Sequence, residues 1–228
     1  MRLSIIIPTY NEVAIIGKLV GYLRKHSPAA EIIVTDGGSS DNTLALAIQQ
    51  GATALQSPQK GRAAQMNYGA SMATGDVFYF VHADTLPPIS FTKDIEVAIE
   101  QGYSLGRYQT RFDSNKFVLR LNAFFTRFNL FECYGGDQSL FMQRQLFEKI
   151  GGFDASLRIM EDYEIVTRAN AVGKYKIMDG KVLVSARKYD TNSWWKVQKA
   201  NYTIVKMYKQ GASQNEMVER YRKMLDYR

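Results

Sequence analysis

The first ninety residues alternate short apolar runs with segments of helical spacing, and this alternation limits the fold more than any other feature. The apolar runs predict four strands and the intervening segments predict helices; the strands are 3–8, 31–37, 52–57 and 75–84, and the helices are 13–25, 42–50 and 61–73. Strands separated by helices of this length pair in parallel through right-handed crossovers. We therefore expect an α/β fold with a mostly parallel, Rossmann-like central sheet flanked by helices.

The length and composition fit one substantial domain, or one domain plus an appendage. The chain has 228 residues, enough for a sizeable core. Its single cysteine, Cys133, excludes an internal disulfide framework and fits a reducing compartment. The apolar run near the N-terminus is too short for a signal peptide, and no stretch approaches the ~20 apolar residues of a membrane span. These features predict a cytoplasmic protein.

The positive charge is concentrated in the C-terminal quarter. Residues 1–173 hold 16 Lys+Arg and 17 Asp+Glu, a net charge of −1, whereas residues 174–228 hold 13 and 5, a net charge of +8. A basic segment suits an anionic membrane surface, an acidic partner or nucleic acid, and it equally suits lysine-rich helices facing water. Without a zinc-finger or RNA-recognition signature, we do not expect nucleic acid as a partner.

Polar residues gather where the predicted strands end. Open α/β sheets bind ligands beyond the carboxyl ends of their strands, so these tips are candidate site residues. The tips are Pro8-Thr9-Tyr10-Asn11-Glu12, Asp36-Gly37-Gly38-Ser39 and His82-Ala83-Asp84. No G-x-G-x-x-G follows the first strand, which argues against a dinucleotide-binding Rossmann unit.

Six segments together resemble family 2 glycosyltransferases over about residues 3–188. In chain order they are IIIPTYNE, DGGSSDNT, GRAAQMNYGA, HADT, GGDQSLFMQRQLFEKIGGFD and EDYEIVTRA. GRAAQMN, HADT and the later SARK are similar to a small bacterial and cyanobacterial branch of that family. The resemblance implies a type A nucleotide-diphospho-sugar transferase fold and sugar transfer from a nucleotide donor. It also implies a catalytic domain, 1–188, with a nucleotide-sugar half (1–89), an acceptor half (90–188) and a basic helical extension, 189–228.

The resemblance implies a nucleotide pocket around the first two strand tips. Asp36 would contact the base or ribose, and Pro8, Tyr10 and Glu12 would line the same pocket. The residues alone leave two alternatives open. Asp36 also suits a turn aspartate that accepts hydrogen bonds from its own loop, and Tyr10 suits either stacking on the base or packing inside the protein.

The start of the predicted helix 61–73 suits a diphosphate. Free N–H groups and the helix dipole at Gly61 favour an anion, and Arg62 adds a fork of donors. Asn67 would reach ribose or phosphate, or lie exposed on the helix, and Asp76 has either a nucleotide role or a turn role. Arg187 would bind donor phosphate or be one more basic surface residue.

The segment His82-Ala83-Asp84 stands where the family commonly has Asp-x-Asp. The resemblance assigns Asp84 as the ligand of Mn²⁺ or Mg²⁺ across the donor diphosphate, because these ions prefer oxygen ligands. His82 departs from the pattern. Three roles stay open for it: contact with the ribose, a nitrogen ligand that favours Mn²⁺, or the end of the strand. Ala83 would lie beside the donor.

The pair Glu161-Asp162 matches the family's catalytic acids. The resemblance assigns Asp162 as the base of an inverting transfer and Glu161 as the residue that positions it. The alternative is a stabilising, negatively charged first helical turn. Gly136 and Asp137 would shape the acceptor site, and we expect Arg168 to form an ion pair. The chain lacks the Q-x-x-R-W motif of processive relatives, which predicts a non-processive enzyme.

Two other function classes remain open, as does the role of an aromatic stripe. A nucleotidyltransferase normally has a glycine-rich first loop that PTYNE does not supply, and a non-catalytic nucleotide-sugar-binding protein would explain the altered metal motif.

The aromatic stripe lies on a predicted helix within 116–134 and suits a core, a second subunit or a membrane interface. It comprises Phe117, Leu121, Phe124, Phe125, Phe128 and Phe131. Trp194 and Trp195 among lysines suit interfacial anchoring, and Ser213 and Glu216 predict a capping box.

Overall fold

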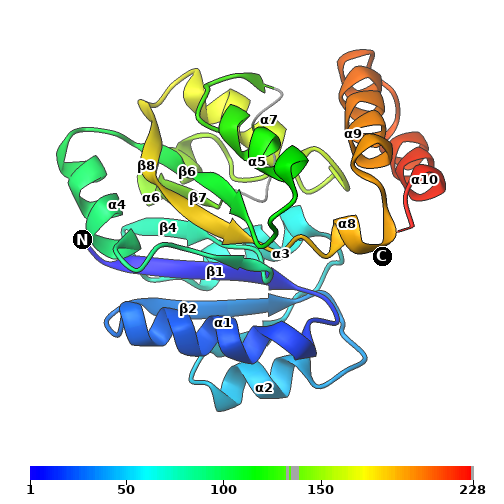
Figure 1. Ribbon diagram of the computed structural model, residues 1–228. Coiled ribbons are helices and arrows are strands. Elements are labelled where there is room, and N and C mark those ends of the chain that lie inside the picture. Colours follow the sequence, from blue (N-terminus) through cyan, green and yellow to red (C-terminus); the bar gives the residue numbers. More distant parts are fainter. Residues whose placement is uncertain (132–133, 135–138, 227–228) are drawn as a thin grey trace.

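The computed structural model describes residues 1–131, 134 and 139–226 (Figure 1). Helices cover both faces of one central sheet. In chain order the elements are β1 (Leu3–Thr9), α1 (Val13–His26), β2 (Glu31–Asp36), α2 (Thr43–Gln49), β3 (Thr53–Gln56), α3 (Arg62–Met72), β4 (Val77–Phe80), β5 (Thr85–Leu86), α4 (Phe91–Glu100), β6 (Leu105–Phe112), α5 (Phe117–Phe125), β7 (Leu140–Gln143), α6 (Arg144–Lys149), α7 (Glu161–Asn170), β8 (Tyr175–Val184), α8 (Lys188–Thr191), α9 (Trp194–Lys209) and α10 (Gln214–Met224).

The sheet has the order β3-β2-β1-β4-β7-β6-β8-β5. Its first four strands are parallel, as the sequence predicts, and β6 also runs parallel to β8. The three remaining pairings, β4–β7, β6–β7 and β5–β8, are antiparallel, so the second half of the sheet is mixed. The α/β fold with a central sheet flanked by helices is confirmed. All four expected strands are present, but the fourth ends at Phe80, and His82 and Asp84 lie in the loop beyond it.

Successive residues of β1 pack on opposite faces of the sheet. Ile5 and Ile7 join a core that includes buried residues of α1, α2 and α4. Ile6 faces the other way, into a core built with α3, α6 and α7. Because both faces of β1 are covered, the strand is a continuous apolar run instead of an alternating one.

β6 is held so closely between its neighbours that Gly106 has no room for a side chain. A Cβ there would lie 2.4 Å from the backbone oxygen of Lys176 and 2.6 Å from Cε1 of Phe141. The next residue, Arg107, is buried. Since side chains alternate across a strand, the close packing at Gly106 fixes Arg107 toward the other face of the sheet.

The C-terminal segment is helical, as expected, and the predicted capping box is present. The Ser213 hydroxyl accepts from the backbone N–H of Glu216, and the Glu216 carboxylate accepts from the backbone N–H of Ser213. The aromatic helix differs from the prediction, because α5 ends at Phe125, well before residue 134. Among the described helices, none has the length and apolar character needed to cross a membrane.

Candidate functional site

The carboxyl ends of β1, β2 and β4 meet at one edge of the sheet, because these neighbouring strands run in parallel. Three non-glycine residues of the described chain have positive φ, and each lies beside a predicted site segment. They are Asn11 (φ 54°) after β1, Ser139 (φ 57°) before β7 and Met160 (φ 73°) before α7. Such strained conformations persist only where the surroundings enforce them, and they concentrate at functional sites.

The first two strand tips are linked by the Asp36 loop. Asp36 is buried, and its Oδ1 accepts from the N–H groups of Gly38 and Ser39 at 2.8 and 2.7 Å. The Ser39 hydroxyl in turn accepts from the N–H of Asn11 at 2.7 Å. Asp36 therefore makes the turn contacts of the structural alternative, and its contact with a base or ribose stays a prediction. Tyr10 is 54% exposed, so the packed-aromatic alternative is wrong.

Arg187 joins two strand tips. Its guanidinium donates to both carboxylate oxygens of Glu12 at 2.7 and 2.6 Å, and to Oδ2 of Asp84 at 3.1 Å. Arg187 follows β8, whereas Glu12 follows β1 and Asp84 follows β4. The interpretation of Arg187 as a mere basic surface residue is wrong, because it is partly buried in a cluster with two predicted donor-site acids.

A second ion pair joins the start of α3 to the start of α7. Nε of Arg62 lies 2.7 Å from Oε1 of Glu161, and the Glu161 side chain is only 1% exposed. Despite this short distance, neither Glu161 carboxylate oxygen has a well-aligned hydrogen bond within the described chain. Burial raises the pKa of Glu161, and the positive charge of Arg62 partly offsets that increase. Gly61 precedes the pair with φ 118°, which a side chain would disfavour.

Arg62→Met should destabilise the protein more at neutral pH than in acid. Below the unfolded pKa of about 4.5, Glu161 is protonated in both states and Arg62 contributes little. As the pH rises, the Glu161 carboxyl ionises readily in the unfolded state, whereas burial opposes its ionisation in the folded state. The free energy of unfolding of the wild type therefore falls until the pH passes the folded pKa. It falls further in the variant, in which folded Glu161 lacks the compensating charge of Arg62. We expect the substitution to lower the free energy of unfolding by about 2 kcal/mol near pH 7.5. This is less than the ~3–5 kcal/mol lost when a fully buried ion pair is broken, because Arg62 is 47% exposed.

Urea unfolding of both proteins at about pH 3.5 and pH 7.5 measures this difference directly. The double variant Arg62→Met/Glu161→Gln removes both charges and should recover most of the lost stability at pH 7.5. An equal loss at both pH values, or no recovery in the double variant, would show that the charge of Glu161 is not what Arg62 compensates.

His82 and Asp162 line the same cavity, between β4 and the first turn of α7. The other lining residues that the structure describes are Phe80, Arg107, Tyr134, Ser139, Leu140 and Val166. His82 is buried and Asp162 is partly buried. The cavity is small, about 20 Å³, which is room for one water molecule or one hydroxyl group. A carboxylate in its lining is suited to accept a proton from a hydroxyl group placed there.

Arg107 is the residue of this cavity that sequence reasoning missed. It is 2% exposed, and its two terminal nitrogens donate to the backbone oxygens of Thr126 and Phe128 at 2.6 and 3.0 Å. Its Nε has no hydrogen-bond partner among the described residues. The sequence carries no signal for this role, because an arginine within a strand is ordinarily exposed.

Two predicted donor residues have other contacts. The Asn67 carboxamide binds the backbone of Phe153, donating to its oxygen at 2.8 Å and accepting from its N–H at 2.9 Å. It is therefore not an exposed helix residue, and its contact with ribose or phosphate stays a prediction. Asp76 lies before β4, at the opposite edge of the sheet, and accepts from the N–H of Arg2 at 3.0 Å. The nucleotide role considered for Asp76 is therefore wrong.

On the acceptor side, one prediction is confirmed and two lie outside the described residues. Arg168 forms the expected ion pair, with two nitrogen–oxygen distances of 2.7 Å to Glu164. Gly136 and Asp137 fall in the stretch 135–138, of which the structure gives no description. Their acceptor role stays a prediction.

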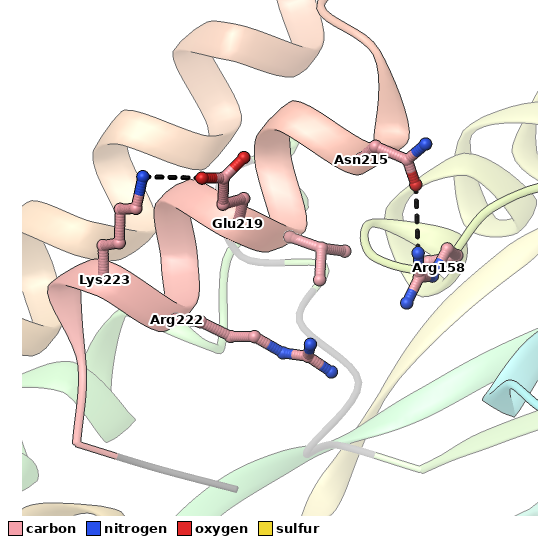
Figure 2. Close-up of a pocket in the computed structure, with 6 residues that line it drawn as sticks. Arg158, Asn215, Glu219, Arg222 and Lys223 are labelled. Atoms are coloured by element: carbon pink, nitrogen blue, oxygen red, sulfur yellow. Dashed lines mark hydrogen bonds and ion pairs between the residues drawn. The ribbon is translucent and has the colours of Figure 1, made fainter.

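The C-terminal helices brace the loop that leads into Glu161. Figure 2 shows Arg158 of this loop pointing toward α10, where it donates to Asn215 at 3.0 Å. Nearby on α10, Nζ of Lys223 lies 2.6 Å from Oε1 of Glu219. These two residues, together with Arg158, Asn215 and Arg222, line a hollow on the surface. Beneath them, Met160 packs with apolar residues of α9 and α10. The extension therefore supports the loop that precedes Glu161.

A divalent cation fits the tip of β4 if the substrate supplies most of its ligands. Within the described residues, no three His, Cys, Asp or Glu side chains form a complete metal site. The carboxylates of Asp84 and Glu12 nevertheless converge on one cationic group, the Arg187 guanidinium. A single hard carboxylate suits Mg²⁺ or Mn²⁺ that is also bound by diphosphate oxygens and water.

Comparisons with known proteins agree with the fold and identify a family. Residues 4–162 match the profile of the family described as "Glycosyl transferase family 2". Protein RfbJ of Shigella flexneri is 33% identical over 83 residues, which cover 36% of this chain and 64% of that protein.

The fold is similar to solved glycosyltransferase structures. TarS (residues 1–349) of S. aureus, solved with UDP-GlcNAc, superposes with a TM-score of 0.69 at 18% identity, covering 82% of this chain and 59% of that one. Mannosyltransferase PcManGT of Pyrobaculum calidifontis, solved with GDP-Man and Mn²⁺, gives 0.69 at 16% identity, covering 92% and 64%. The chain thus spans less than two thirds of these relatives. The likeness confirms the predicted type A fold.

Proposed function

The chain belongs to glycosyl transferase family 2 and is a family 2 glycosyltransferase, and from this premise we propose a specific reaction and site. The enzyme transfers a sugar from a UDP- or GDP-sugar to an acceptor hydroxyl, with inversion, in a non-processive and metal-dependent reaction. The observation that carries this proposal is the cavity that His82 and Asp162 both line. His82 lies two positions before Asp84, the predicted cation ligand. This cavity supports a base at Asp162 that acts beside the strand tip carrying the predicted cation ligand.

The donor occupies the tips of β1, β2 and β4. Asp36, Pro8, Tyr10 and Glu12 surround the nucleotide, and the exposed ring of Tyr10 is available to stack on the base. The start of α3, at Gly61 and Arg62, faces the diphosphate, because the N-terminus of a helix favours an anion. The bound UDP-GlcNAc of TarS and GDP-Man of PcManGT support a donor of this class.

Asp84 holds Mn²⁺ or Mg²⁺, and Arg187 adds a second positive charge beside the diphosphate. When bound, the cation neutralises charge on the leaving nucleoside diphosphate. His82 and Ala83 lie between this position and the cavity, and His82 orients the donor ribose or sugar. The Mn²⁺ in the PcManGT structure supports this assignment.

Asp162 removes the proton from the acceptor hydroxyl. As that oxygen forms a bond to the anomeric carbon, the bond from this carbon to the diphosphate oxygen breaks, and the bonding electrons leave with the nucleoside diphosphate. The proton remains on the Asp162 carboxylate. A single displacement of this kind inverts the anomeric configuration. Glu161, held by Arg62 at 2.7 Å, is a positioning residue that fixes the first turn of α7.

A thermal-shift screen tests the proposal. UDP-GlcNAc or GDP-mannose at about one hundred times its dissociation constant should stabilise the native state by ~2.7 kcal/mol, and the melting temperature should rise by about 5–10 °C, in a Mn²⁺-dependent manner. The same mixtures should slowly release nucleoside diphosphate. Pyrophosphate released from a nucleoside triphosphate would indicate a nucleotidyltransferase instead. Donor binding without turnover across a broad acceptor panel would indicate a binding protein.

We also propose that the chain divides at residues 89 and 188 into a nucleotide-sugar half, an acceptor half and a C-terminal extension. Two partners are proposed besides the substrates: a second copy of the chain and an anionic membrane surface. The membrane partner is the one for which the structure offers a specific surface.

A further inference from the structure

Most of the aromatic stripe on α5 faces solvent. Of the three alternatives for the stripe, core packing is wrong for this face, since Phe117 is 74% exposed. The other exposed apolar residues of the stripe and the turn after it are Leu121, Phe124, Phe125, Phe128 and Leu130. Phe131 instead packs against Tyr163 and Tyr208. A continuous apolar face of this size on a water-soluble domain marks an interaction surface.

The first turn of α9 adjoins this face. The indole N–H of Trp194 donates to Oδ1 of Asn122 on α5 at 3.2 Å, and the rings of Trp194 and Trp195 lie 4.5 Å apart. Trp195 is 76% exposed. It begins an exposed stripe along α9 that alternates aromatic and basic residues: Trp195, Lys199, Tyr202, Lys206 and Lys209. We call the exposed residues of α5, its following turn and α9 the α5–α9 face.

The charge of the α5–α9 face has one sign. Residues 116–131 and 192–212 contain seven Lys or Arg and no Asp or Glu. Arg127 places its guanidinium 4.0 Å above the ring of Phe124, so apolar and cationic groups are interleaved. Phenylalanine and tryptophan among lysines and arginines suit the headgroup region of an anionic bilayer, where aromatic rings enter the interface and cations meet lipid phosphates.

We propose that the α5–α9 face docks the enzyme on an anionic bilayer. A second copy of the chain is a poorer occupant, because a two-fold contact would bring seven cations against seven like charges without a single acid. Docking would also place the site near the membrane. Arg107 lines the cavity of Asp162 and binds the backbone at Thr126 and Phe128, beside the exposed stripe. This last point rests on the proposed function, because docking would then bring the acceptor side of the active site to the lipid headgroups.

Vesicle co-sedimentation of the full chain, without donor, tests the docking. We expect binding to phosphatidylcholine vesicles containing roughly 30% phosphatidylglycerol and little binding to pure phosphatidylcholine. Phe124→Ser/Phe125→Ser and Lys199→Glu/Lys206→Glu should each weaken binding about tenfold or more. The chain has only two tryptophans, and Trp195 lies on the docking face, so intrinsic fluorescence should shift to shorter wavelength when anionic vesicles are added.

Matched controls alter exposed residues on helices of the opposite region in Figure 1. Ile48→Ser on α2 replaces one exposed apolar side chain with serine, and Lys18→Glu/Lys25→Glu on α1 reverses two charges as in the lysine variant; both should leave vesicle binding intact. Absence of binding to anionic vesicles at low salt would overturn the proposal, as would equal binding of the face variants and the wild type. Self-association that the face variants abolish, without vesicle binding, would assign the face to a second copy.

Nucleoside diphosphate release without vesicles separates this inference from the proposed function. The face variants should retain it at the wild-type rate, because none of the substituted residues lines the cavity. Docking without any donor turnover would leave the membrane surface standing and overturn the transferase mechanism. Turnover without docking would do the reverse.

Discussion

Asp162→Asn should lower sugar transfer by about 10²–10⁴, the usual contribution of a positioned general base, with donor affinity unchanged. The substitution keeps the size and shape of the side chain but replaces the carboxylate with a neutral amide, which is far too weak a base to take the hydroxyl proton. Asp162 lines the cavity with His82 and Arg107, and it is not among the residues proposed to hold the nucleotide or its diphosphate. The loss should therefore appear in kcat, measured as nucleoside diphosphate release with acceptor present, and not in the donor-dependent thermal shift.

Asp76→Asn is the matched control. It makes the same chemical change at an aspartate on the opposite edge of the sheet, where the side chain binds the N–H of Arg2. Its turnover should match that of the wild type. If Asp162→Asn transferred sugar at the wild-type rate, proton removal would have to be assigned to another group, and Asp162 would only stabilise the first turn of α7.

The strand tips were predictable because period and pairing follow from local sequence. A continuous apolar run such as Ile5–Ile7 demands cover on both faces, and parallel pairing then brings Glu12, Asp36 and Asp84 to one edge. The same reasoning supplied the capping box at Ser213, since its hydrogen bonds join residues three positions apart. The fourth strand was predicted too long, because β4 ends at Phe80 and apolar composition alone does not show where pairing stops.

Contacts between distant segments were not predictable from the sequence. Arg62 looks like a free diphosphate ligand, yet it pairs with Glu161, 99 residues away. Arg187 looks like a surface cation, yet it joins Glu12 and Asp84. Tertiary packing determines which charged residues pair, and the hydrophobic periodicity of the sequence contains no information about these pairs. The stripe at Phe117 shows the same limit, since amphipathic spacing defines an apolar face without saying what covers it.

Asp84→Asn should remove the metal dependence of turnover. A cation at the leaving diphosphate contributes several kcal/mol, and each ~1.36 kcal/mol is a factor of ten in rate, so we expect a loss on the order of 10²-fold or more. The amide keeps one oxygen but not the charge. Arg187 would still be held by two bonds to Glu12 at 2.7 and 2.6 Å, and the local fold should therefore survive.

The decisive comparison is made with and without Mn²⁺. In the wild type, chelation by EDTA should abolish nucleoside diphosphate release and reduce the thermal shift produced by the donor. In Asp84→Asn, added Mn²⁺ should change neither quantity, whereas Asp76→Asn should respond like the wild type. Full turnover of the chelated wild type would mean that a positive charge already in the chain, Arg187 beside Asp84 at 3.1 Å, neutralises the leaving group without a metal.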